Sequence, residues 1–156
     1  MGGEVKARAA TALGATHVID HTREDVPTQV REMTAGRGVD MIVDTLGGFV
    51  TEQSMTILAP FGRLVICGHT AGPAATLLST ELHRQNRSVL GYSTGHQRRT
   101  RPHGLKPAVD QVLRAATEGH LRVVVAARLP LHQAPDGHTL VEGRTAVGRV
   151  LLDTHS

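Results

Sequence analysis

The chain reads LGATHVID at residues 13–20, GRGVDMIVD at residues 36–44 and LAPFGRLVICG at residues 58–68. Each stretch joins a helix end or a glycine turn to a short apolar segment that can form a buried strand. Helical patterns of apolar residues separate the three segments. Strands that alternate with helices in this way predict an α/β protein whose parallel sheet is covered on both faces.

The rest of the chain continues this alternation. Helices are expected at residues 4–13, from Asp25 to Gly36, at residues 50–58, around Leu77 to Leu82, at residues 105–118 and near residues 136–142. Strands are expected at residues 17–20, 39–43, 64–67, 88–93, 123–131 and 148–152. In the helix at 105–118, the residues expected to face inward are Val109, Val112, Leu113 and Ala116.

The composition limits the classes of protein to consider. A chain of 156 residues with 40% hydrophobic residues is long enough for one domain with a core. Aromatic residues make up only 2%, so the core must be built from Val, Leu, Ile and Ala, which suits buried parallel strands. Cys67 is the only cysteine, which excludes an intrachain disulfide and a cysteine zinc cluster. We expect it to be a small buried apolar residue.

The sequence contains no apolar run long enough to span a bilayer, and its N-terminus lacks the pattern of a signal peptide. No membrane partner and a cytoplasmic location are therefore expected. The net charge is +3, and the excess is concentrated at Arg98, Arg99 and Arg101, beside His96 and His103. Such a run could meet phosphate or nucleic acid. Because no interleaved aromatic residues accompany it, nucleic acid is not the expected partner, and a solvated or cofactor-facing loop at residues 94–104 is expected.

Several segments occur in the order and at the spacing of a known family. They are Lys6 followed by ALGA at residues 12–15, VID at 18–20, GRGVD at 36–40, DTLGG at 44–48, LAPFGR at 58–63 and GRVLL at 148–152. Together they resemble the C-terminal half of the medium-chain dehydrogenase/reductase family, most closely its quinone-oxidoreductase-like, zinc-type alcohol dehydrogenase relatives. The resemblance covers nearly the whole chain. It implies a Rossmann-type doubly wound parallel sheet and an oxidoreductase that uses NADPH.

The resemblance also implies which residues contact the cofactor. They are Lys6, His21, Asp44, Thr45, Leu46, Gly68, His69, Tyr92, Ser93 and Arg149. Lys6 and His21 match positions near the 2′-phosphate of NADPH, and Arg149 replaces the lysine that closes the family pattern. The remaining seven residues follow strands, at the carboxyl edge where ligands bind in open α/β sheets.

Simpler roles stay open for several of these residues. Lys6 can be a solvated charge in the first turn of a helix, and His21 can be a polar surface residue. Asp44 can cap the turn after its strand, and Tyr92, the only tyrosine, can fill the edge of a core. The histidines scatter over expected loops, so no metal site, zinc included, is expected.

Other parts of the family's fold have no counterpart in these 156 residues. No G-x-G-x-x-G occurs, the loop that binds the pyrophosphate in such domains. The first two strands and the N-terminal substrate domain are also missing, and Gly2 and Gly3 resemble the middle of a family segment, so Met1 could be an internal start. The expected domains are a truncated dinucleotide-binding domain at residues 1–120 and a return segment at residues 121–156, which in the family packs on the substrate domain.

The family's strand order makes the pairing of one strand a problem. In the order 3-2-1-4-5-6, the segments 17–20 and 39–43 would be the third and fourth strands, which are not neighbours. The segment 17–20 would then have no partner strand, and a stable monomer is not expected. The expected partners are a second copy, because family members pair through the strand that matches 88–93, or a missing half supplied in trans.

Two functions therefore stay open, and a phosphate- or nucleic-acid-binding module that uses the basic run at residues 98–101 is a third, less favoured one. The first is a truncated NADPH-dependent, quinone-oxidoreductase-like protein that transfers hydride to an activated double bond or carbonyl when it is complemented. The second is a repurposed relative that binds a small molecule, serves as a subunit, or catalyses a cofactor-free isomerisation or cyclisation with Asp44, His69 or Tyr92. The absent glycine loop favours the second for the isolated chain, and Lys6 with the strand-end loops favours the first.

Overall fold

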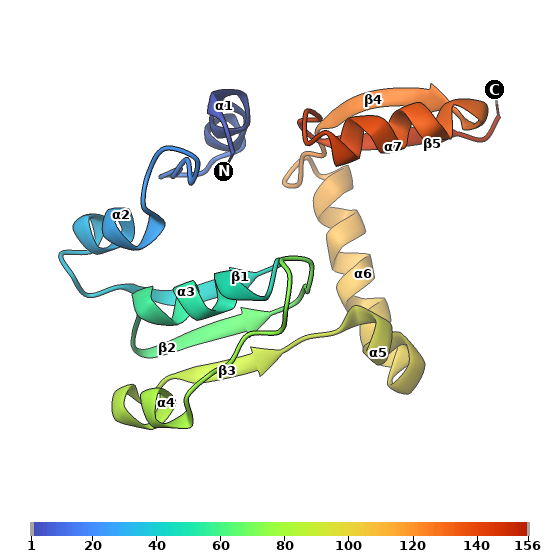
Figure 1. Cartoon of the computed structure of the whole chain (residues 1–156). Helices are drawn as coiled ribbons and strands as arrows, with labels where there is room; N and C mark the ends of the chain where they lie inside the picture. Colours follow the sequence, from blue (N-terminus) through green and yellow to red (C-terminus); the bar gives the residue numbers. More distant parts are fainter. Residues whose placement is uncertain (1, 156) are drawn as a thin grey trace. The chain divides into compact units, whose positions relative to one another are not determined.

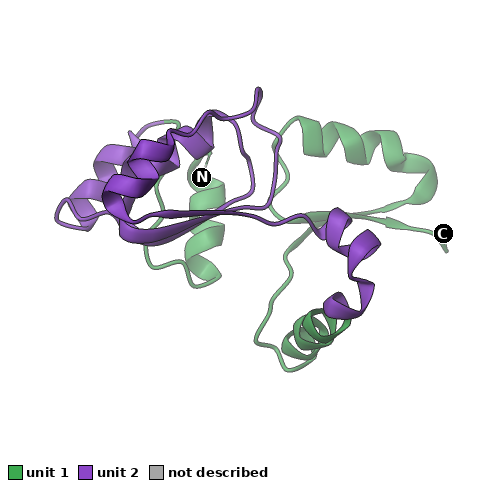
Figure 2. Ribbon diagram, turned by 90° about the horizontal axis from the view of Figure 1, so that it is seen from below, with its two compact units in different colours: residues 1–22, 106–156 green, residues 23–105 purple. Residues whose placement is uncertain are grey.

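The structure of the chain is a computed structural model that describes residues 2–155. It divides into two compact units, one formed by residues 23–105 and the other by residues 1–22 together with residues 106–156 (Figure 2). The predicted division at residue 120 follows the family's architecture and stays a prediction. No helix within residues 2–155 has the length and apolar character needed to cross a membrane.

The unit formed by residues 23–105 is built on a parallel sheet of three strands. The strands are β1 (Val39–Asp44), β2 (Leu58–Ile66) and β3 (Ser88–Gly91), in the spatial order β1-β2-β3 (Figure 1). Helix α3 (Phe49–Ile57) connects β1 to β2, and helix α4 (Ser79–Gln85) connects β2 to β3. This arrangement confirms the prediction of an α/β fold with a parallel sheet.

Helices cover one face of this sheet. The strand register places Ile42, Leu64 and Val89 side by side on that face, and Leu64 is fully buried. The register places Val43, Val65 and Leu90 side by side on the other face, where Val43 is 62% and Leu90 48% exposed. Within this unit, the helices that connect the three strands supply a layer on one face of the sheet.

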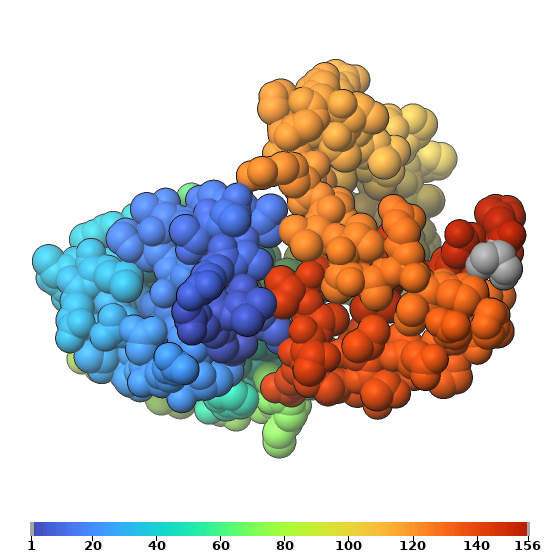
Figure 3. All heavy atoms as spheres, turned by 90° about the horizontal axis from the view of Figure 1, so that it is seen from above, coloured from blue at the N-terminus to red at the C-terminus, as the bar shows by residue number. Residues whose placement is uncertain are grey.

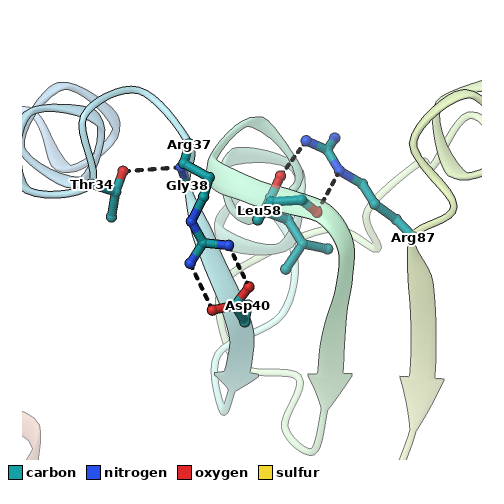
Figure 4. A network of polar contacts seen from close by, with 7 residues as sticks. Thr34, Arg37, Gly38, Asp40, Leu58 and Arg87 are labelled. Atoms are coloured by element: carbon teal, nitrogen blue, oxygen red, sulfur yellow. Dashed lines mark hydrogen bonds and ion pairs between the residues drawn. The ribbon is translucent and has the colours of Figure 1, made fainter.

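The entry to β1 is fixed by local polar contacts. Helix α2 (Val26–Met33) begins at Asp25, whose carboxylate accepts hydrogen bonds from the backbone N–H and the hydroxyl of Thr28. After the helix, the Gly38 amide donates to the Thr34 hydroxyl oxygen at 3.0 Å (Figure 4). Gly38 has a positive φ, and any β-carbon there would clash with the carbonyl oxygen of Ile57, so only glycine fits this turn.

The start of β3 is joined to the end of α3 by one arginine. The Arg87 guanidinium donates to the carbonyl oxygens of Met55 at 3.0 Å and Ala59 at 3.3 Å, and also to that of Leu58 (Figure 4). These are carbonyls at and just after the end of a helix, which have no partner within the helix itself. Arg87 therefore supplies donors to these carbonyls and links the start of β3 to the end of α3 and the start of β2.

Two predicted segments differ from the structure. Residues 17–20 join neither sheet, so the strand expected there is wrong, and the family's order explains why: its neighbouring strand is not in these residues. The expected loop at 94–104 is also wrong, because it contains helix α5 (Thr94–Thr100) and the start of helix α6 (Pro102–Thr117). The Ser93 hydroxyl caps α5 by accepting from the His96 amide, and Pro102 stands at the first position of α6, where proline is favoured.

Helix α6 has an apolar face, as predicted, but that face is not buried. Val109, Val112 and Leu113 are each more than half exposed, and the atoms of this helix, in orange, lie at the surface in Figure 3. The expectation that they face inward is wrong. An amphipathic pattern identifies which face of a helix is apolar, but it does not supply the layer that covers it.

The second unit contains helix α1 (Glu4–Ala12) and a parallel pair of strands, β4 (Val125–Pro130) and β5 (Arg149–Asp153). A short 3-10 turn at Leu131–Gln133 leads into helix α7 (Ala134–Glu142), which packs on both strands. Gly137 is buried at this contact, with side chains of β4 and β5 close to the position that a β-carbon would occupy. The predicted strands and helix of the return segment are thus present.

Candidate functional site

The carboxyl ends of the three parallel strands meet at one edge of the sheet, and their loops are bonded to one another. The backbone N–H groups of Thr70 and Ala71 donate to the carbonyl oxygen of Leu46, at 2.6 and 2.9 Å. The backbone N–H of Tyr92 donates to the carbonyl oxygen of Ile66 at 2.8 Å. Ligands of open α/β sheets bind at this edge, so we take these loops as the candidate site.

Asp44, the last residue of β1, organises the first of these loops. One oxygen of its carboxylate accepts from the amides of Leu46 at 2.8 Å and Gly47 at 3.0 Å, and the other accepts from the Thr51 hydroxyl at 2.5 Å. Asp44 is only 3% exposed, so its carboxylate is turned into the protein. The structure therefore gives Asp44 the turn-capping role that the sequence left open, and Thr51 in α3 is a partner that the sequence analysis missed.

Opposing effects act on the pKa of Asp44. Burial of the carboxylate raises its pKa, whereas the hydrogen bonds from the Thr51 hydroxyl and from the amides of Gly47 and Leu46 lower it. The hydrogen bonds outweigh the burial, so the pKa of Asp44 lies below the ordinary value of an aspartate. The carboxylate is consequently ionised and held in place near neutral pH.

Glycines let the two loops approach backbone to backbone. A β-carbon at Gly68 would clash with the carbonyl oxygen of Thr45, and one at Gly48 would clash with that of Ala71. Gly47 and Gly48 also have positive φ angles. Because glycine has no side chain, these loops can pack closely against each other and leave their backbone accessible to a ligand.

The structure brings seven of the ten predicted site residues to this edge. They are Asp44, Thr45, Leu46, Gly68, His69, Tyr92 and Ser93. Four of them have exposed side chains that could contact a ligand: the hydroxyl of Thr45, the apolar group of Leu46, the imidazole of His69 and the phenol of Tyr92. The hydroxyl oxygen of Ser93 accepts the hydrogen bond that caps α5, and this bond limits its contacts with a ligand.

The other three predicted residues belong to the second unit. Lys6 lies on α1, His21 follows the buried Asp20, and Arg149 begins β5. The Asp20 carboxylate accepts from the amides of Gly3 and Thr22, which ties the start of α1 to the segment that carries His21. The structure does not place these three residues at the sheet edge, and their contact with a cofactor stays a prediction.

Cys67 differs from its prediction. It follows β2 directly and is exposed, whereas the sequence analysis expected a buried residue. The backbone N–H of Cys67 donates a hydrogen bond to the carbonyl oxygen of Asp44 at 2.8 Å, and the thiol of Cys67 donates to the same oxygen at 3.4 Å. The backbone of Cys67 thus helps to align the ends of β1 and β2.

The part of the chain that the structure describes does not gather a set of potential metal ligands. His17 and His21 stand four residues apart, but their segment is not a helix, so the spacing does not place them on one face. Among residues 2–155, no three or more His, Cys, Asp or Glu side chains come close enough to bind a metal ion.

A parallel sheet with glycine-packed loops at its carboxyl edge is typical of Rossmann-like domains. The sequence model of the family described as zinc-binding dehydrogenase matches residues 13–152. The chain therefore belongs to this family, the medium-chain dehydrogenase/reductases, which the sequence analysis had identified by resemblance.

Several of the proteins that this chain resembles are oxidoreductases. A quinone oxidoreductase of Pseudomonas aeruginosa is 28% identical over 94% of this chain and 45% of its own length. The crystal structure of an NAD-dependent alcohol dehydrogenase is 35% identical, with a TM-score of 0.80 over 98% of this chain and 42% of its own. The structure of a mycobacterial protein complexed with NADPH is 28% identical, with a TM-score of 0.81 over 97% of this chain and 48% of its own. The chain thus spans less than half the length of each relative.

Proposed function

We propose that this chain supplies part of the cofactor site of an NADPH-dependent, quinone-oxidoreductase-like enzyme. The observation that carries the proposal is the sheet edge where glycine-packed loops from β1 and β2 lie beside the exposed end of β3. The family match and the similarity to oxidoreductases support it. The reaction we propose is hydride transfer to an activated double bond or carbonyl, carried out when the chain is complemented by the other half of such a fold.

The chain's own residues suit the binding of an extended dinucleotide. NADPH, when bound, supplies the hydride. Thr45, Leu46 and His69 stand on the loops against which its nicotinamide end would lie, and Tyr92 stands at the end of β3. Lys6 would pair with the 2′-phosphate, and His21 and Arg149 would add polar contacts. Asp44 would not touch the cofactor through its carboxylate, but would hold the loop that carries Thr45 and Leu46.

The first test is binding of NADPH and NADH to the purified chain, followed by nucleotide fluorescence. Because the chain contains no G-x-G-x-x-G, it lacks several donors to the pyrophosphate, each worth about 1.5–3 kcal/mol when charged. We therefore expect weak or undetectable binding by the chain alone, and a large gain when the N-terminal half of a quinone oxidoreductase is added. Micromolar binding by the chain alone would contradict this expectation.

The complemented complex then tests the cofactor and the reaction. Lys6→Ala should weaken NADPH binding about tenfold or more and leave NADH binding unchanged, since only NADPH carries the 2′-phosphate. Gly68→Ala should abolish binding of both nucleotides, because the new methyl group would force apart the loops of β1 and β2. Oxidation of NADPH by a quinone is the expected activity. A complex that assembles but binds neither nucleotide would overturn the proposal.

A further inference from the structure

The segment between Glu81 and Asp110 contains no acidic residue. Its six positive residues are Arg84, Arg87, Arg98, Arg99, Arg101 and Lys106. These six charges exceed the formal net charge of +3 for the whole chain. The segment is therefore strongly positive, whereas the rest of the chain has more acidic than basic residues.

Three of the six cations have partners. Arg84 forms an ion pair with Glu81 at 3.4 Å, and Lys106 forms one with Asp110 at 2.8 Å. The guanidinium of Arg87 is occupied by backbone carbonyls at the end of α3. These residues are explained by the fold.

The other three cations have no such explanation. Arg98 and Arg99 lie in the last turn of α5, and Arg101 follows that helix directly. All three are exposed, and among residues 2–155 their side chains make no ion pair or hydrogen bond. Three like charges over four positions repel one another, and the helix supplies only a partial negative charge at its C-terminal end. A bound anion with several charges would replace this repulsion with attraction.

The arginines stand on a rigid element close to the candidate site. Helix α5 begins immediately after Ser93, at the carboxyl end of β3, and the Ser93 hydroxyl caps it. Seven helical residues rise about 10 Å, so the backbone of Arg98 and Arg99 lies within about that distance of Ser93. Their backbone positions are fixed without any contact from their side chains, which leaves the planar guanidinium groups available for a ligand.

We propose that Arg98, Arg99 and Arg101 form a binding site for a small anion that carries two or more linked phosphate groups. The guanidinium group binds phosphate through paired hydrogen bonds, and three of them can share the charges of one polyphosphate. The short span of α5 and the single tyrosine of the chain favour a small ligand over a nucleic acid strand, which needs a longer track and stacking side chains. The site does not depend on the proposed contacts to NADPH.

The test uses inorganic tripolyphosphate, titrated into the full chain by calorimetry at low and at physiological salt. The cluster variant Arg98→Gln/Arg99→Gln/Arg101→Gln should bind about tenfold more weakly than the unmodified chain, or worse. The matched control, Arg8→Gln/Arg84→Gln/Arg114→Gln, removes the same net charge from exposed positions outside the cluster and should bind as the unmodified chain does. Circular dichroism verifies that each variant is folded, and the single variant Arg99→Gln, expected to weaken binding partially, replaces the triple variant if that fails to fold.

Three results would overturn the proposal. One is no binding of tripolyphosphate by the unmodified chain, and another is equal weakening in the cluster and control variants, which would show a general effect of charge. The third is tighter binding of a short single-stranded oligonucleotide than of tripolyphosphate, with a steep dependence on salt, which would show a nucleic acid surface. Tripolyphosphate contains neither nicotinamide nor adenine, so a failure to bind it would not contradict the proposed function. A failure to bind NADPH would likewise not contradict the polyphosphate site.

Discussion

Asp44 organises the candidate site at the scale of one residue. Its carboxylate is buried and accepts bonds from Thr51 and from two loop amides. Asp44→Asn should lower the free energy of unfolding by about 1.5–3 kcal/mol near neutral pH, because hydrogen bonds to a charged group are lost. Thr51→Val should have a smaller effect of the same sign, because one acceptor oxygen loses its donor. Urea denaturation measures both changes.

The lowered pKa of Asp44 gives this prediction a dependence on pH. Because folding lowers the pKa of Asp44, its carboxylate stabilises the folded chain at pH values above the pKa of the unfolded group, about 3.9. This stabilisation is lost as the pH falls below that value. The difference in stability between the unmodified chain and Asp44→Asn should therefore shrink in acid. Asp40→Asn is the control, because Asp40 pairs with Arg37 at the exposed surface and should matter little at any pH. A difference that is constant with pH would contradict the role given to the Asp44 charge.

Phe61 shows strain at a single residue. It has a φ of 62° and is 74% exposed, a combination that favours glycine. The left-handed region disfavours residues with a β-carbon by roughly 1–2 kcal/mol, and the greater freedom of unfolded glycine offsets part of that. Phe61→Gly should raise the unfolding temperature by a few degrees. Phe61→Ala removes the ring but keeps the β-carbon, so equal gains in both variants would show that exposure of the ring, not the backbone, is responsible.

At the scale of elements, β3 is the feature that bears on assembly. It is an outer strand of its sheet, and its apolar residues include Leu90, which is 48% exposed. An outer strand without charge or proline is a template for pairing. We expect two copies to pair through residues 88–93, and Leu90→Lys to dissociate them, because a lysine charge would be buried in the interface.

Size-exclusion chromatography with light scattering measures this assembly. The control Thr80→Lys adds the same charge on α4, away from the strand, and should leave the assembly unchanged. A folded, monodisperse particle with the mass of one chain would refute the interface. Persistence of the dimer in Leu90→Lys would place the interface elsewhere.

At the scale of the whole molecule, few apolar residues among residues 2–155 are buried. The buried apolar residues within 2–155 are four: Ile57, Leu58, Ala59 and Leu64. We expect the isolated chain to unfold at low temperature and with weak cooperativity.

Addition of the N-terminal half of a quinone oxidoreductase should raise the unfolding temperature of the chain. It would cover apolar surface such as Val43 on the open face of the sheet, and Val109 and Leu113 on α6. Differential scanning calorimetry measures the shift, and an unrelated α/β domain of similar size is the control. The same shift with both proteins, or with neither, would contradict specific complementation.

The sequence by itself determined the elements of the strand-end site. Periodicity and glycine turns located β1, β2 and β3, and the parallel order of the strands followed from the helices between them. Since parallel strands end at one edge, the sequence also placed Asp44, His69 and Tyr92 together. These features depend on local pattern and on topology, which adjacent parts of one chain can specify.

Tertiary structure decided what each segment could pair with or pack against. The pattern of residues 17–20 is that of a strand, but a strand exists only beside a partner, and residues 17–20 join neither sheet. The apolar face of α6 and the side chain of Cys67 were both predicted to be buried, and both are exposed. A side chain is buried only where another surface packs against it, and the local sequence does not specify that surface. The inward turn of the Asp44 carboxylate toward Thr51 likewise came from the packing of α3 against the end of β1, because a hydrogen bond across the fold depends on where both partners lie.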